Sequence, residues 1–167
     1  MSNTDDRGVG GQTSKGTPLK STNDKLRLLI TDDSRLLRKK LREELENLGC
    51  EVIEASNGKE AIMRDLEQEP DGVILDIVMP EVGGIEALQV IREVSPTVPI
   101  VMLSSAGTPQ KLMQTLKMGA IDFIQKPYTK EQIARAVESI RKARAKNLKK
   151  AAQAAKKHDR SSENEEP

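Results

Sequence analysis

The chain has 167 residues, of which 36% are hydrophobic, and its formal net charge at pH 7 is +1. This length allows one domain with a substantial core, and the balanced charge creates no overall field that would attract nucleic acid or a membrane surface. The single cysteine, Cys50, excludes an internal disulfide, and no apolar stretch could span a membrane or form a signal peptide core, which predicts a soluble cytoplasmic protein.

The N-terminal segment, residues 1–24, consists mainly of Ser, Thr, Asn, Gly and Lys. It offers almost nothing to bury, so we expect it to be disordered. The folded block then runs from about Lys25 to Ile140, where short apolar runs alternate with amphipathic stretches.

The apolar runs predict five strands, at Leu26–Thr31, Glu51–Ala55, Gly72–Asp76, Ile100–Ser104 and Ile121–Ile124. Helices are predicted between and after them, since most of these stretches begin at a capping residue and end at Gly or Pro. Their ranges are Ser34 to Leu48, Asn57 to about Gln68, Gly84 to Val94, Thr108 up to Gly119, and Thr129 onwards. In the first helix, five leucines are predicted to share one face: Leu36, Leu37, Leu41, Leu45 and Leu48.

The remainder of the chain, residues 144–167, is basic and then acidic. It could prolong the fifth helix as a solvated extension, or it could form a basic arm for an acidic partner or nucleic acid. Sequence-specific DNA reading is not expected, because the chain has only two aromatic residues, Phe123 and Tyr128, and no helix-turn-helix pattern.

The predicted strands are apolar on both faces and alternate with helices, which indicates an α/β protein with a parallel sheet covered on both sides. For five strands we expect the flavodoxin-like, doubly wound (βα)5 fold with strand order 2-1-3-4-5. Strands 1 and 3 are then neighbours at the switch point where such sheets bind ligands. Asp32 and Asp33 follow strand 1 and Asp76 ends strand 3, so the three carboxylates should converge there.

Carboxylates this close need a counter-charge, and an oxygen-only ligand set suits Mg²⁺ or Mn²⁺ and not zinc. Since Mg²⁺ often binds carboxylates together with a phosphate, a phosphoryl group is the natural partner. Ser104 ends strand 4 and Lys126 follows strand 5, so a hydroxyl and an ammonium should face the same site. Asp76 is thereby predicted to be a phosphoryl acceptor.

At these positions the chain resembles the receiver domain of bacterial two-component response regulators (CheY-like) over residues 25–143. The matching elements are Asp-Asp after strand 1, LDIVMPEVGG around Asp76, Ser104, and Lys126-Pro127. The resemblance implies that Asp76 accepts phosphate from a histidine kinase, and that Asp33, Asp76 and the backbone carbonyl of Val78 bind the metal. Asp32 would act mainly through a metal-bound water. It further implies that Ser104 and Phe123 form a switch pair, that Lys126 pairs with the phosphate, and that the Lys126-Pro127 bond is cis.

The family resemblance also implies how the signal would be passed on. A stand-alone receiver would act on a downstream protein through the face formed by the fourth helix, fifth strand and fifth helix, in a chemotaxis-like or relay role. It would be a monomer or a phosphorylation-linked dimer, and would catalyse its own phosphorylation without being a turnover enzyme. Val78 and Ala106 occupy positions that in the family steer the hydrolytic water, and because both are apolar we expect a long-lived phosphoaspartate.

Two alternatives stay open. A phosphatase of the haloacid dehalogenase type also uses an aspartyl phosphate, but that family has Asp-x-Asp after strand 1, whereas Asp32 and Asp33 are adjacent. The other alternative is a receiver-fold binding module that is never phosphorylated.

Overall fold

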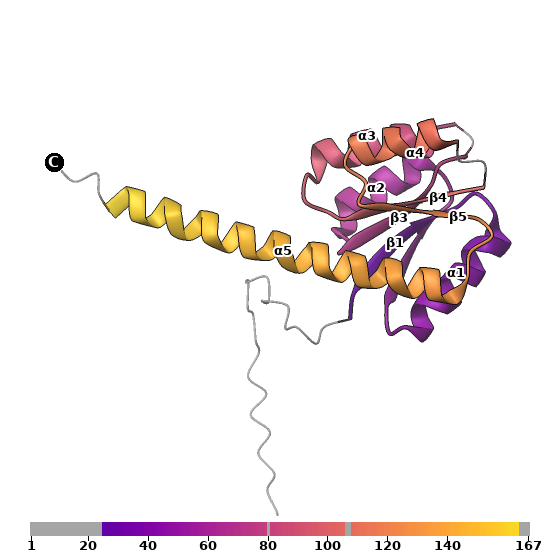
Figure 1. Cartoon of the computed structure of the whole chain (residues 1–167), viewed down its shortest axis with the longest axis horizontal. Coiled ribbons are helices and arrows are strands. Elements are labelled where there is room, and N and C mark those ends of the chain that lie inside the picture. Colours follow the sequence, from indigo (N-terminus) through magenta and orange to yellow (C-terminus); the bar gives the residue numbers. More distant parts are fainter. Residues whose placement is uncertain (1–24, 80, 106–107, 164–167) are drawn as a thin grey trace, which may run out of the picture.

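A computed structural model describes residues 25–79, 81–105 and 108–163, with side chains up to residue 158. The segment 1–24, for which disorder is predicted, lies outside these residues. Five parallel strands form one sheet in the order β2-β1-β3-β4-β5, as the sequence predicts (Figure 1). The strands are β1 (Arg27–Thr31), β2 (Glu51–Ala55), β3 (Gly72–Asp76), β4 (Ile100–Ser104) and β5 (Asp122–Gln125).

Helices cover both faces of this sheet. In Figure 1, α1 and α5 lie below the strands while α2, α3 and α4 lie above them. This arrangement is the doubly wound fold expected from the alternation of strands and helices. The helices are α1 (Arg35–Asn47), α2 (Gly58–Gln68), α3 (Gly84–Val94), α4 (Pro109–Lys117) and α5 (Lys130–Glu163).

The central strands bury side chains on both faces, because successive residues of a strand point to opposite sides of the sheet. In β1, Leu28 and Ile30 lie in the core between the sheet and helices α1 and α5. Leu29 lies in the core on the other face, between the sheet and helices α2 and α3. All residues of β3 and β4 are buried. The aliphatic runs of the sequence therefore form two cores that hold the carboxyl ends of the strands in a fixed arrangement.

The predicted helix starts are confirmed by capping hydrogen bonds. The side chains of Ser34, Asn57 and Thr108 each accept a hydrogen bond from the backbone N–H three residues later. At the start of α2, the Glu60 carboxylate accepts hydrogen bonds from the backbone and hydroxyl of Ser56, one residue before the cap. The capping box predicted there is thus completed by Ser56 and not by Asn57.

Two details of the prediction are wrong. The first and fifth strands begin one residue later than expected, at Arg27 and Asp122. In α1, only Leu41 and Leu45 of the five predicted leucines are buried, and Leu36 is 76% exposed. At about 100° per residue, Leu36 lies roughly 140° around the helix from Leu41, which turns it away from the sheet.

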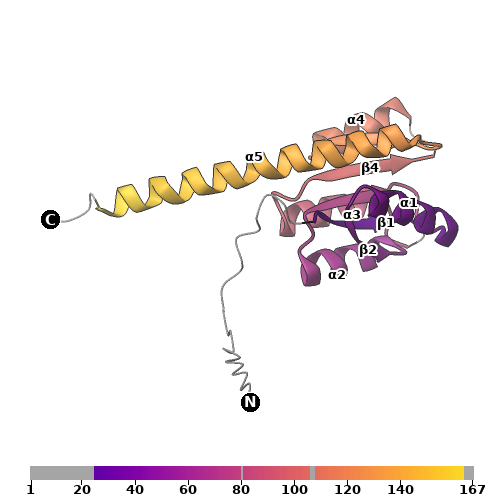
Figure 2. The same cartoon turned by 90° about the horizontal axis from the view of Figure 1, so that it is seen from below.

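Helix α5 begins at the predicted capping box, in which Thr129 and Gln132 exchange hydrogen bonds of 2.8 and 3.2 Å. Its first turns bury apolar side chains against the sheet, and its later turns run on past the end of the sheet (Figure 2). The tail from residue 144 to Glu163 is therefore a continuation of this helix. Of the helices in the described part of the chain, none combines the length and apolarity needed to cross a bilayer.

Candidate functional site

The predicted acidic residues meet at the carboxyl edge of the sheet. Strands β1 and β3 pair in parallel with Thr31 opposite Leu75, so the residues that follow, Asp32 and Asp76, lie side by side. Asp32 is 2% exposed and Asp76 is 3% exposed, while the adjacent Asp33 is exposed. Carboxylate oxygens of all three lie within 4.8 Å of one another.

Lys126 reaches this cluster from the end of β5. Its Nζ lies 2.7 Å from Oδ2 of Asp32 and 2.9 Å from Oδ2 of Asp76, and its side chain is largely buried. The lysine is fixed by its backbone N–H, which donates to the carbonyl of Ser104 at 2.8 Å, and it precedes a cis peptide bond to Pro127, as expected. One ammonium thus bridges two buried carboxylates, a strong charge-assisted arrangement.

Burial and charge act against each other in this cluster. Burial raises the pKa of the Asp76 carboxyl, helped by the negative charge of Asp32, and the Lys126 ammonium opposes this rise only in part. For Lys126, burial alone would lower the pKa, but the hydrogen bonds to Asp32 and Asp76 outweigh it and the pKa is raised. The raised pKa means that the lysine stays charged at neutral pH, so one ammonium faces a group of three acids.

Ser104, Phe123 and Val78 lie around the cluster. Ser104 is buried at the end of β4, directly after Leu103, which pairs with Asp76. Phe123 is half-buried in β5 and packs against the core between the sheet and helices α2 and α3. The backbone N–H of Val78 donates to Oδ1 of Asp76 at 3.3 Å. Ala106 lies outside the described residues.

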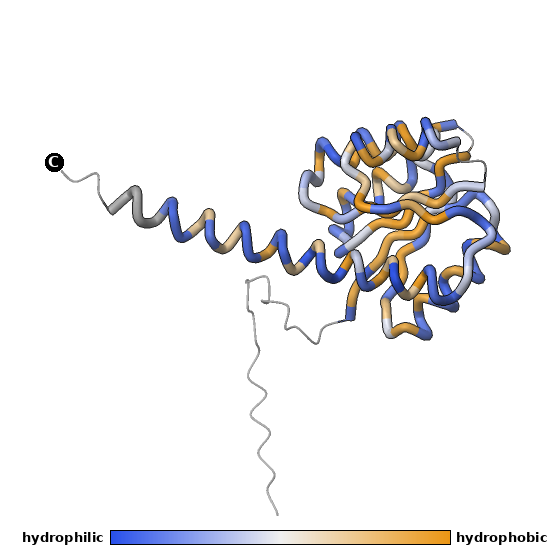
Figure 3. Tube along the Cα trace, in the orientation of Figure 1, coloured by the Kyte–Doolittle hydropathy of each residue, from blue (hydrophilic) through white to orange (hydrophobic). Residues whose placement is uncertain are grey.

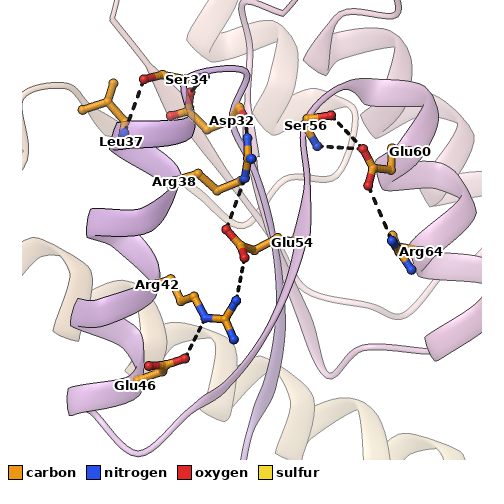
Figure 4. A network of polar contacts seen from close by, with 10 residues as sticks. All are labelled: Asp32, Ser34, Leu37, Arg38, Arg42, Glu46, Glu54, Ser56, Glu60 and Arg64. Atoms are coloured by element: carbon orange, nitrogen blue, oxygen red, sulfur yellow. Dashed lines mark hydrogen bonds and ion pairs between the residues drawn. The ribbon is translucent and has the colours of Figure 1, made fainter.

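Arg38 and Glu54 support Asp32, a feature that was not predicted from the sequence. The guanidinium of Arg38 donates to the backbone carbonyl of Asp32 at 2.7 Å and to the carboxylate of Glu54 at 3.2 Å (Figure 4). The Asp32 side chain in turn accepts a hydrogen bond from the backbone of Ser34 at 2.9 Å. The only signal in the sequence is the charged Glu54 within β2, which needs a partner, since nothing in a sequence marks the backbone carbonyl of Asp32 as an acceptor. These contacts fix the position of Asp32.

The residues present fit a hard divalent cation. Among the described residues, Asp32, Asp33 and Asp76 form a group with the oxygen-only donors that Mg²⁺ prefers. The exposed Asp33 leaves one side open, so a cation bound here could keep water or phosphate oxygens as further ligands.

Known proteins share the sequence pattern and the fold of this chain. The family model of the response regulator receiver domain matches residues 28–138. The chemotaxis protein CheY of Thermotoga maritima is 37% identical over 117 residues, which cover 70% of this chain and 98% of that protein.

Two solved structures give the same result. Chemotaxis protein CheY4 of Vibrio cholerae is 28% identical, with a TM-score of 0.67 over 70% of this chain and 99% of that one. CheY of Borrelia burgdorferi, in a complex with CheX, BeF3 and Mg²⁺, is 32% identical, with a TM-score of 0.67 over 69% of this chain and 88% of that one. The chain therefore belongs to the response regulator receiver domain family.

Proposed function

We propose that the protein accepts a phosphoryl group on Asp76 from the phosphohistidine of a histidine kinase and signals by binding another protein. The observation that carries this proposal is the surroundings of Asp76: a buried carboxylate 2.9 Å from the Lys126 ammonium and grouped with two further acids. A carboxylate held beside a cation and a metal-binding group is suited to attack phosphorus.

The metal would be Mg²⁺, with Mn²⁺ as a substitute, held by Asp33, Asp76 and the backbone carbonyl of Val78, and by Asp32 through a water. The complex of the Borrelia burgdorferi relative with Mg²⁺ and BeF3, whose three fluorines resemble the three oxygens of a phosphoryl group, supports this assignment. When bound, the ion would reduce the repulsion among the carboxylates and neutralise charge on the phosphoryl oxygens.

In the transfer step, an oxygen of the Asp76 carboxylate attacks phosphorus while the bond from phosphorus to the imidazole nitrogen of the donor breaks. The bonding electron pair leaves with the imidazole. Lys126 is in place to pair with a phosphoryl oxygen, because its Nζ already lies within hydrogen-bond distance of Asp76. The hydroxyl of Ser104 would donate a hydrogen bond to a second phosphoryl oxygen.

The output would pass through the face formed by α4, β5 and α5, with Ser104 and Phe123 as the coupled switch. A groove of about 360 Å³ lies on this face, lined by residues of β5 and α5 that include Phe123, Gln125 and Arg135. On α4, the side chain of Met113 is exposed. A groove and an exposed apolar side chain on these elements would suit docking of a partner, in a chemotaxis-like or a relay role.

The metal requirement gives a direct test of this function. Incubation with phosphoramidate, a donor with a phosphorus–nitrogen bond, should add one phosphoryl group per chain when Mg²⁺ is present and none when EDTA is present. Intact-mass spectrometry measures the addition, and circular dichroism confirms that the protein is folded in both samples. Absence of labelling in the folded protein with Mg²⁺ would favour the unphosphorylated binding module.

The lifetime of the phosphoaspartate should depend on Val78. Its apolar side chain is 53% exposed beside Asp76 and cannot hydrogen-bond an attacking water. We therefore expect slow hydrolysis in the wild-type protein and hydrolysis several-fold faster in Val78→Asn, measured as loss of phosphoprotein after removal of the donor. Val94→Asn is the matched control, since Val94 is similarly exposed but ends α3 away from the site. A wild-type half-life of seconds would contradict this prediction.

A further inference from the structure

The long helix α5 leaves the domain in a defined direction. Where it passes the end of the sheet, Nε of Arg144 lies 3.1 Å from a carboxylate oxygen of Asp71. One turn later, the amide of Asn147 donates to the backbone carbonyl of Thr97 at 2.7 Å. These contacts anchor the helix to the loops before β3 and β4, and the following turns project away from the domain (Figures 1 and 2).

From residue 141 to residue 157, the lysines of α5 lie on one side of the helix. Every charged residue from Arg141 to Lys157 is basic. At about 100° per residue, all six lysines of this segment fall within an arc of roughly 120°, opposite the side that continues the buried face of α5. We call this the lysine face, and its members are all exposed: Lys142, Lys146, Lys149, Lys150, Lys156 and Lys157. In Figure 3, this extension of α5 is largely blue, for hydrophilic residues, whereas the strands of the sheet are largely orange, for hydrophobic ones.

The charge density along the lysine face is similar to that along one strand of a nucleic acid duplex. From Lys142 to Lys157 the helix rises by about 22 Å, so the lysine face presents roughly one charge every 4 Å. Phosphates of one nucleic acid strand are spaced by about 3.4 Å along the duplex. Because like charges at neighbouring turns repel one another, a ligand of opposite charge would also stabilise the helix. We propose that the lysine face binds the phosphate backbone of double-stranded nucleic acid without reading its sequence.

The side opposite the lysine face argues against a membrane. It carries Ala151, Ala154 and Ala155, and Leu148 is the one large apolar residue between positions 141 and 158. Helices that lie in a bilayer surface bury a face of large apolar or aromatic side chains, which this segment lacks.

Other ligands fit less well. Single-stranded nucleic acid is usually held by stacking on aromatic rings, and the extension contains none. Lysines of this kind contact phosphates irrespective of base sequence.

The test uses the full chain and fluorescein-labelled duplexes of about 24 base pairs, one of DNA and one of RNA, with the same mixed sequence. Fluorescence anisotropy should show binding at 50 mM salt that weakens steeply by 200 mM, with log K falling against log salt with a slope of about −3 to −5. Comparison of the two affinities shows whether the lysine face binds DNA or RNA more tightly.

A triple substitution of the lysine face, Lys146→Gln, Lys149→Gln and Lys150→Gln, should weaken binding at least tenfold at 50 mM salt and reduce the slope by about 2 to 3. Glutamine keeps the helix propensity similar. The matched control removes three exposed lysines of the domain, by Lys39→Gln, Lys59→Gln and Lys111→Gln, and should leave the affinity within about twofold. Circular dichroism checks that both variants keep their helix content.

Several outcomes would overturn the proposal. One is the absence of binding to either duplex at 50 mM salt, and another is equal weakening by the two triple variants. Tighter binding to vesicles containing phosphatidylserine would assign the lysine face to a membrane surface. Competition by polyglutamate as strong as that by unlabelled duplex, at equal charge, would assign it to acidic proteins. None of these results depends on phosphorylation of Asp76.

Discussion

Replacement of Lys126 by methionine is expected to slow phosphoryl transfer to Asp76 by about 10²–10³-fold, the effect typical of losing one charged donor in such a site. The reason is the position of Nζ, which bridges the buried carboxylates of Asp32 and Asp76 at 2.7 and 2.9 Å. Methionine has a similar length and fills the space without supplying the charge. Labelling by phosphoramidate with saturating Mg²⁺, followed over time by intact-mass spectrometry, measures the rate.

The same substitution should destabilise the metal-free fold by about 3 kcal/mol at neutral pH, because it leaves two buried carboxylates without their counter-charge. The effect should depend on pH. Burial already raises the pKa of the Asp76 carboxyl, and loss of the ammonium would raise that pKa further. The folded state then binds the proton more tightly than the unfolded chain, so this carboxyl stabilises the fold while protonated, and the contribution is lost as pH rises through the folded pKa.

Urea unfolding in EDTA at several pH values measures this stability. The deficit of Lys126→Met should be smallest in acid and largest at neutral pH. Lys59→Met is the control, since Lys59 is exposed on α2, and it should change neither labelling nor stability appreciably. Wild-type labelling rates in Lys126→Met would contradict the role given to the lysine.

Replacement of Gly84 by alanine is expected to destabilise the fold by about 3 kcal/mol, at the upper end for an added methyl group in a packed interior. Gly84 begins α3, and its N–H donates to the carbonyl of Ile77 at 2.9 Å. A Cβ at this position would collide with the backbone carbonyl oxygen of Asp76 itself. Either α3 or the phosphoacceptor must then move, so the labelling rate should fall as well.

The neighbouring glycine gives a matched control. A Cβ on Gly83 would have its nearest heavy atom, the carbonyl oxygen of Ile77, at an ordinary distance of 3.7 Å. Gly83→Ala should therefore cost less than about 1 kcal/mol, mainly through a weaker helix cap. Thermal and urea unfolding compare the two variants. Equal stability of Gly83→Ala and Gly84→Ala would show that the close approach of α3 to Asp76 is not needed.

The sheet and the acid cluster could be predicted because few physical rules determine them. Strands such as Gly72–Asp76 are apolar on both faces, which requires helices on both sides of a parallel sheet. The strand order follows from this parallel, doubly covered sheet, and it brings together the residues at the carboxyl ends of neighbouring strands. Asp32 and Asp76 therefore lie where the sequence predicts them. The contact of Lys126 with both acids was not predicted, since it depends on the path of a single long side chain.

The exposure of Leu36, the contacts of Arg38 and the end of α5 could not be predicted from the spacing of apolar residues in the sequence. Leu36 fits the apolar pattern of α1, but the rotation of that helix on the sheet exposes it. Arg38 supports Asp32 through a hydrogen bond to a backbone carbonyl, and backbone acceptors leave no trace in a sequence. Helix α5 continues to Glu163 although little apolar surface remains to be buried, so its end could not be predicted from an amphipathic pattern.

Location of the phosphoryl group on the chain tests the central claim most directly. The experiment compares wild type with Asp76→Asn and with the control Asp122→Asn, which changes an exposed acid at the start of β5. Each protein is treated with acetyl phosphate and Mg²⁺, digested at acidic pH and analysed by tandem mass spectrometry. We predict one added phosphoryl group on the peptide containing Asp76 in wild type and Asp122→Asn, and none in folded Asp76→Asn. Equal labelling of all three proteins, or a phosphoryl group on another residue, would contradict the assignment of Asp76 as the acceptor.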